Sequence, residues 1–262
     1  MSMLAALAVM GQAHAADAPL RPDQEAFLEI FKELVETNTT LSAGSCTLAS
    51  ERMAARLKAG GIPASQITLF ATPEHPKEGG LVAVYPGTSS TAKPILAIAH
   101  IDVVEAKRED WERDPFKLVE EDGYFYARGV KSQAAVWVDM LIRFQQSGYQ
   151  PKRTVKIALT CGEETNGAFN GIEWLAANRR DLIDAEFALN EGGGGDTDGK
   201  GKVVGQSVQV GEKTFANFRL ETRNPGGHSS VPVRDNAIYQ LARALGKIDE
   251  HEFPLEMTET TR

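Results

Sequence analysis

The sequence lacks an excess of positive charge. Its 262 residues contain 28 Lys and Arg against 36 Asp and Glu, which gives a formal net charge of -8 at pH 7. Binding to nucleic acid or to an anionic membrane surface depends on clustered Lys and Arg, so neither is expected as the main partner. With 42% hydrophobic and 24% charged residues, the composition is otherwise that of an ordinary globular protein.

The sequence also lacks internal repeats, coiled-coil heptads and any apolar run long enough to span a bilayer. The apolar stretch Met3 to Gly11 is too short for a transmembrane helix. It is followed by Ala13-His14-Ala15, which has the small-x-small form of a cleavage site. Although no Lys or Arg precedes the apolar stretch, this pattern predicts a signal peptide over residues 1–15. We therefore expect export to a periplasmic or extracellular location.

Cysteine is scarce, since the chain contains only Cys46 and Cys161. In an oxidising compartment these two residues can form one disulfide, and the alternative is a pair of buried free thiols. The sequence leaves this choice open. Neither cysteine has a His close by in the sequence, so nothing indicates a thiol nucleophile.

Segments with helical and strand-like patterns alternate along most of the chain. Helical periodicity predicts helices at residues 22–36, 47–58, 132–146 and 172–178. Short apolar runs predict strands at residues 67–70, 81–85, 94–99, 154–161 and 185–189, and Glu121-Asp122-Gly123 indicates a hairpin. This alternation predicts an α/β domain with a mostly parallel sheet and helices on both faces.

The pattern changes from about Val203. Residues 208–210 and 215–221 alternate like strands that are exposed on one face, and residues 236–248 form a helical run. These segments predict the start of a second, smaller α+β domain. The run NPGGHSSVP, which contains His228, is expected to be a loop inside it.

Three of the expected strands end abruptly in polar residues. Ligands of open α/β sheets bind beyond the carboxyl ends of the strands, so the residues that follow these strands are candidates for a shared site. They include one imidazole and four carboxylates: His100 and Asp102, Glu163 and Glu164, and Glu191. The glycine run at residues 192–195 is more typical of a flexible loop, because it lacks the strand-GxGxxG-helix context of a nucleotide site.

These residue types are those of a metal hydrolase, which needs ligands for a divalent ion and a separate carboxylate that takes a proton from water. His100 is a candidate ligand, and Asp102 is placed to orient its imidazole. Because adjacent side chains cannot both point the same way, Glu163 and Glu164 suit a division into one base and one ligand. Glu191 adds a further oxygen ligand.

Six ordered segments carry a family resemblance: AIAHIDVVE, WERDPF, GYFYARGV, LTCGEET, LNEGGGG and NPGGHSSVP. Over residues 23–248 the chain resembles the zinc-dependent exopeptidases and amidohydrolases that include aminoacylase, glutamate carboxypeptidase and succinyl-diaminopimelate desuccinylase. The resemblance implies a phosphorylase/hydrolase-like catalytic α/β domain over residues 16–205 and a partial lid over residues 206–262 that mediates homodimerisation. It also implies two zinc ions bridged by water, and hydrolysis of a peptide or N-acyl amino acid through zinc-activated water.

The resemblance further implies a role for each matching residue. Glu163 is the expected general base, Asp102 orients the metal-binding imidazole, and His228 of the lid stabilises the oxyanion. The expected metal ligands are His100, Glu164 and Glu191. A histidine of a capped turn is the alternative interpretation of His228.

Two departures from the family pattern leave the activity open. Ser132 stands where the family has an Asp that bridges both metal ions, and a neutral hydroxyl cannot replace that carboxylate. The last part of the catalytic domain, with a final His ligand, is also absent from the sequence. We therefore keep three interpretations: a two-zinc hydrolase, a single-metal site formed by the three remaining ligands, and a truncated remnant that binds no metal and has no catalytic activity.

Overall fold

The computed structural model describes residues 19–129, 131–165, 167–209, 211, 216–228, 230–231 and 233–259. The chain divides into two compact units, of which the first ends at Glu191 and the second begins at Gly192. The expected signal peptide, residues 1–15, lies outside the described residues, and the expected domain boundary at residue 205 stays a prediction. Among the described helices, none combines the length and the apolar character that a membrane crossing requires.

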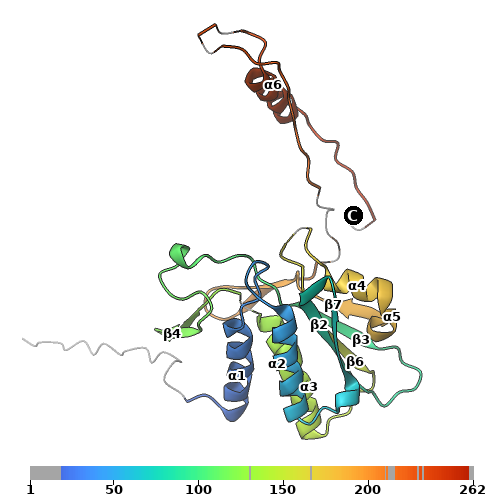
Figure 1. Ribbon diagram of the computed structural model, residues 1–262. Helices are drawn as coiled ribbons and strands as arrows, with labels where there is room; N and C mark the ends of the chain where they lie inside the picture. Colours follow the sequence, from blue (N-terminus) through green and yellow to red (C-terminus); the bar gives the residue numbers. More distant parts are fainter. Residues whose placement is uncertain are drawn as a thin grey trace, which may run out of the picture. The chain divides into compact units, whose positions relative to one another are not determined.

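The first unit is built on a five-stranded sheet with the strand order β1-β2-β6-β3-β7 (Figure 1). The strands are β1 (Ile67–Thr72), β2 (His75–Tyr85), β3 (Ile95–His100), β6 (Val155–Thr160) and β7 (Phe187–Leu189). Strand β3 runs parallel to both β6 and β7, whereas β2 runs antiparallel to β1 and β6.

The expected α/β fold is confirmed, but the sheet is mixed, with one parallel and one antiparallel half. The β1–β2 connection is a tight turn, and a tight turn can join only antiparallel strands because a parallel pair needs a long crossover. The parallel half is the one that carries the candidate site residues.

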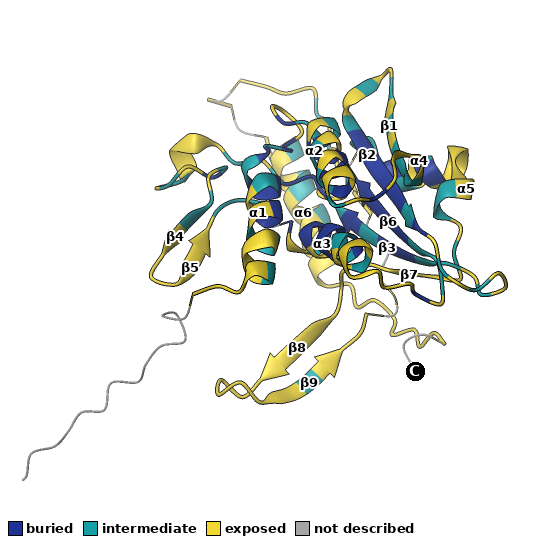
Figure 2. Ribbon diagram, turned by 90° about the horizontal axis from the view of Figure 1, so that it is seen from below, coloured by how far each residue is buried: buried dark blue, intermediate teal, exposed yellow. Residues whose placement is uncertain are grey.

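Helices cover both faces of the sheet, as expected (Figures 1 and 2). One face is covered by α1 (Pro22–Glu36), α2 (Cys46–Ala59) and α3 (Ser132–Ser147), and the other by α4 (Gly171–Asn178) and α5 (Arg180–Ile183). The short 3-10 helices are η2 (Ala64–Gln66) and η3 (Arg108–Asp110). The ends of the helices follow local sequence signals: the Ser45 side chain caps α2, the Asn170 side chain caps α4, and Gly148 ends α3 with a φ of 67°.

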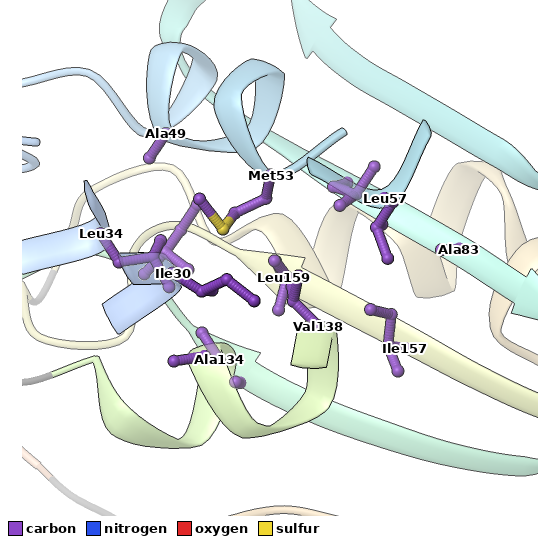
Figure 3. Close-up of a cluster of buried hydrophobic side chains, with 14 of the residues drawn as sticks. Ile30, Leu34, Ala49, Met53, Leu57, Ala83, Ala134, Val138, Ile157 and Leu159 are labelled. Atoms are coloured by element: carbon purple, nitrogen blue, oxygen red, sulfur yellow. The ribbon is translucent and has the colours of Figure 1, made fainter. Parts of the chain in front are cut away.

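The alternation of side chains along β6 fixes which residues face which helical layer. Ile157 and Leu159 pack into the core beneath α1, α2 and α3 (Figure 3), whereas Ala158 faces the α4 side. A register shift of one residue would exchange these two sets, so burial on both faces holds the register of the central strands.

The expected hairpin forms from β4 (Val119–Glu121) and β5 (Tyr124–Tyr126). The two turn residues Asp122 and Gly123 have φ values of 53° and 77°. Positive φ at both central residues is what a two-residue hairpin with the right strand twist requires, and Asp-Gly suits it.

The second unit contains a hairpin of β8 (Gly194–Thr197) and β9 (Val203–Ser207), and the helix α6 (Ala237–Asp249). The strands expected at residues 208–210 and 215–221 were wrong: the described residues 208–209 and 216–221 are not in strands, and Val210 and Phe215 lie outside the described residues. A strand exists only through pairing, and in the described part these segments have no paired neighbour. The glycine run expected as a loop instead contributes Gly194 and Gly195 to β8.

We predict that Leu159→Ala lowers the free energy of unfolding by about 3–5 kcal/mol, because it leaves a cavity at a fully buried position. The matched control is Leu69→Ala on β1, where the side chain is 43% exposed and the loss should stay below about 1.5 kcal/mol. Urea denaturation of both variants measures the difference. Equal losses at the two positions would contradict this account of the core.

Candidate metal centre

The parallel strands β6, β3 and β7 end at the same edge of the sheet. His100 is the last residue of β3 and pairs with Thr160, the last residue of β6, in the strand register. Glu163 follows β6 by three residues, and Glu191 follows β7 by two. The strand pairing therefore delivers these three side chains to one place, as the sequence predicts.

His100, Glu163 and Glu191 form a group in which one ligand atom from each residue lies within 4.8 Å of the others. The Nε2 atom of His100 is 3.7 Å from Oε2 of Glu191. Two atoms bound to the same zinc ion lie at most about 4.4 Å apart, because each bond is about 2.0–2.2 Å long. Small side-chain movements would therefore bring the three atoms into one coordination sphere.

Asp102 lies behind the His100 imidazole, at the position expected for an orienting residue. Its side chain is buried, and Oδ1 is 3.5 Å from Nδ1 of His100. Nδ1 also lies 3.0 Å from the backbone oxygen of Asp102, and Oδ2 accepts a 2.9 Å hydrogen bond from the backbone N–H of Glu164. Asp102 thus contacts the imidazole and the acidic segment together, and leaves Nε2 directed at Glu191.

The carboxylates control the charge of the imidazole. Burial alone would lower the pKa of His100, but its interaction with Asp102 and the negative charges of Glu191 and Glu163 raise the pKa to about 9. The pKa of Asp102 is lowered, because the interactions with His100 and the backbone N–H groups of Glu164 and Glu163 outweigh the effect of its burial. Without a metal ion, the imidazole therefore carries a proton at neutral pH and partly offsets the carboxylates.

Glu163 is a carboxylate of the site whose pKa is raised. Partial desolvation and the negative charges of its acidic neighbours raise its pKa, while the positive charge of His100 acts in the opposite direction. A raised pKa makes a carboxylate a better proton acceptor, which suits a general base. The group within 4.8 Å contains Glu163 and not Glu164, so the expected roles of base for Glu163 and ligand for Glu164 stay predictions.

Ser132 is the exposed first residue of α3, at the place where the resemblance implies a bridging carboxylate. The residue before it, Lys131, is 4% exposed, and its Nζ donates hydrogen bonds to the backbone oxygens of Leu34 at 2.8 Å and Thr37 at 3.0 Å. Burial lowers the pKa of Lys131 to about 7, although the charge of Asp102 acts against this shift. Sequence reasoning missed this buried amine, because a single lysine before a helix carries no signal of burial.

His228 belongs to the second unit, where its Nδ1 lies 2.7 Å from Oγ of Ser230 and accepts a hydrogen bond from the backbone N–H of Ser230. These contacts stay within one turn. The expected role of His228 at the oxyanion therefore stays a prediction.

The structure forms the Cys46–Cys161 disulfide that the sequence left open. It joins the first residue of α2 to the residue that follows β6, directly before Gly162-Glu163-Glu164. Cys46 and Cys161 are 1% and 7% exposed, so the bond is part of the interior.

Comparison with known proteins identifies one matching family. The model of Peptidase family M20/M25/M40 matches residues 96–260. Similar curated proteins include N-fatty-acyl-amino acid synthase/hydrolase PM20D1 from Homo sapiens, which is 30% identical over 175 residues that make up 64% of this chain and 34% of the relative. Aminoacylase-1 from Mus musculus is 30% identical over 173 residues, or 64% of this chain and 40% of the relative.

Probable carboxypeptidase S-like 2 from Dictyostelium discoideum is 31% identical over 191 residues, which are 69% of this chain and 36% of that protein. The chain thus spans about a third to two fifths of the length of these relatives.

Among solved structures, the M20 metallo-carboxypeptidase Sso-CP2 from Sulfolobus solfataricus is similar, with a TM-score of 0.51 and 21% identity. The match covers 63% of this chain and 37% of that one. Human carnosine dipeptidase 1 has a TM-score of 0.50 and 20% identity, with 64% and 38% covered. These two structures share the fold.

We predict that His100 in the metal-free protein titrates near pH 9 instead of at its ordinary pKa of 6.5. Because the folded pKa lies above the unfolded one, the stabilisation from the protonated imidazole is complete below about pH 6.5 and is lost as the pH rises through about 9. An NMR titration of the imidazole, assigned with the His100→Gln variant, measures the pKa. Asp102→Asn should lower it, and a His100 signal that titrates at or below pH 6.5 in the parent would contradict the prediction.

Proposed function

Because the chain belongs to peptidase family M20/M25/M40, we propose that it carries the metal site of a hydrolase that cleaves the amide bond of a peptide or an N-acyl amino acid. The observation that carries the proposal is the convergence of His100, Glu163 and Glu191 at the carboxyl ends of three parallel strands. Relatives whose names include N-fatty-acyl-amino acid synthase/hydrolase, aminoacylase-1 and probable carboxypeptidase support these substrate classes.

Zinc is the proposed metal. An imidazole nitrogen and carboxylate oxygens are zinc ligands, and the contact of His100 with the buried Asp102 is the kind of support that metal-binding histidines have. His100 and Glu191 would hold the ion together with one member of the Glu163-Glu164 pair. A bound zinc ion polarises a carbonyl group and lowers the pKa of water, so that water can attack at neutral pH.

Glu163 is the proposed general base. It takes a proton from the attacking water and passes it to the leaving nitrogen. A base of this kind has to lie close to the ligands without being one of them, and the position of Glu163 within 4.8 Å of His100 and Glu191 suits that requirement. In this assignment Glu164 is the third ligand, and His228 stabilises the oxyanion.

The competing proposal is a remnant that has lost catalysis, and Ser132 is the observation that favours it. Two dications need a carboxylate between them to offset their mutual repulsion, and a serine hydroxyl carries no charge. We therefore propose one zinc ion per chain for an active site, and none for the remnant.

Export and dimerisation are also proposed. The Cys46–Cys161 disulfide supports an oxidising compartment, in agreement with the signal peptide expected over residues 1–15. The described part of the second unit exposes many apolar side chains, which supports self-association through residues 206–262. Among them are Phe218, Ile238, Leu245, Phe253 and Leu255.

The central test is Glu163→Gln, which removes the base and keeps the size of the side chain. We predict that hydrolysis of a panel of dipeptides and N-acyl amino acids falls by about 100-fold or more, while elemental analysis still finds one zinc ion per chain. Glu173→Gln in the first turn of α4 is the matched control and should leave both measurements unchanged. A parent chain that neither binds zinc nor hydrolyses any substrate would overturn the proposal, and loss of zinc from Glu163→Gln would make Glu163 a ligand.

A second test restores the missing charge. Ser132→Asp is expected to strengthen zinc binding by about tenfold or more, because it supplies a carboxylate where the family pattern has one. Ser147→Asp adds the same charge at the other end of α3 and should not change the affinity. Competition with a chromophoric chelator measures both variants. Equal effects of the two substitutions would show that position 132 has no special relation to the metal.

A further inference from the structure

The segment that carries Glu163 and Glu164 connects β6 to α4, and we call residues 161–165 and 167–170 the acidic loop. Its first residue, Cys161, is bonded to Cys46 across 115 positions of sequence. Gly162 has a φ of 93°, and an added Cβ would come within 1.9 Å of the backbone oxygen of Phe169. The acidic loop therefore folds back on itself within two residues of Glu163.

The partner cysteine belongs to a firmly held part of the first unit. Cys46 is the first residue of α2 and is 1% exposed. Next to it, the Thr47 hydroxyl donates to the backbone oxygen of Pro76 at 2.8 Å and accepts from the N–H of Gly79 at 2.9 Å. The start of α2 is thus tied to β2, so the disulfide connects the acidic loop to the frame of the sheet.

Hydrogen bonds hold the acidic loop at three more points. The N–H of Glu164 donates to Asp102 at 2.9 Å, and the N–H of Gly171 donates to the backbone oxygen of Cys161 at 2.8 Å. The N–H of Phe169 donates to Glu78 at 3.1 Å. The first bond restrains the loop at Glu164, the second joins its first residue to the start of α4, and the third restrains its far end. The disulfide is the covalent restraint, two residues before Glu163.

One side of the acidic loop is not closely packed. A cavity of about 230 Å³ borders the acidic loop and the disulfide. Its walls include Asp102, Gly162, Thr165 and Ala168, together with Cys46 and Cys161. Atoms that line a cavity lack contact partners on one side, so dispersion contacts do not restrain the loop on the side that faces the cavity.

We propose that Cys46 and Cys161 are positioning residues for the metal site, so that zinc affinity depends on the disulfide through Glu163 and Glu164. This inference rests on the proposed function for its metal, but the placement of the acidic loop can be measured without one. The metal site would then depend on the oxidised state of Cys46 and Cys161 as well as on the pairing of the strands that precede its ligands.

The zinc experiment is a double-mutant cycle on the full chain. Cys46→Ala/Cys161→Ala removes the disulfide without leaving thiols, which would themselves bind zinc. We expect zinc affinity, measured by chelator competition, to fall by about 10- to 100-fold. In the Glu163→Gln/Glu164→Gln background, removal of the disulfide should cause no further loss. The same fold-loss in both backgrounds, or no loss in either, overturns the proposal, because a general structural role does not act through these two carboxylates.

Hydrogen exchange on the metal-free chain is the second measurement. Without the disulfide, peptides from the acidic loop should exchange faster, while peptides from β3 and α3 keep their protection. Unchanged exchange in the acidic loop overturns the proposal. If the parent chain binds no zinc, only the proposed function is refuted. Hydrogen exchange still tests whether the disulfide holds the acidic loop in place. If the double alanine variant does not fold, Cys46→Val/Cys161→Ala restores apolar volume and takes its place in both experiments.

Discussion

The parallel pairing of β6, β3 and β7 is the constraint on which the site depends. Parallel strands end at a common edge, so residues that follow them meet although more than 90 positions separate His100 from Glu191. The pairing is in turn held by burial on both faces, since β6 presents Leu159 to one helical layer and Ala158 to the other. The convergence of the candidate ligands is therefore a consequence of how the core is packed.

That convergence places like charges together, which is unfavourable without a cation. In the metal-free chain the protonated His100 supplies part of the compensation, as its raised pKa indicates. A metal ion would displace this proton and take over the compensation with a larger charge. The same carboxylates therefore hold the proton and attract the metal, so metal binding and pH are coupled at this site.

The sequence predicts those features that have a local signal, and it misses those that depend on distant neighbours. A short stretch of sequence is enough to predict the helix bounds, the Asp122-Gly123 hairpin and the strand that ends at His100. The antiparallel half of the sheet and the absence of strands at residues 216–221 depend on which segments pair, which no single stretch encodes. The burial of Lys131 depends on α1, whose backbone oxygens lie nearly 100 positions away in the chain.

The balance of charge at the site bears on the proposed number of metal ions. Asp102 is already engaged with His100, which leaves Glu163, Glu164 and Glu191 to offset added positive charge. If one glutamate serves as the base, the remaining two neutralise a single dication. A second dication would need a further carboxylate, but position 132 offers a neutral hydroxyl. The charges in this part of the chain thus support one ion and oppose a pair.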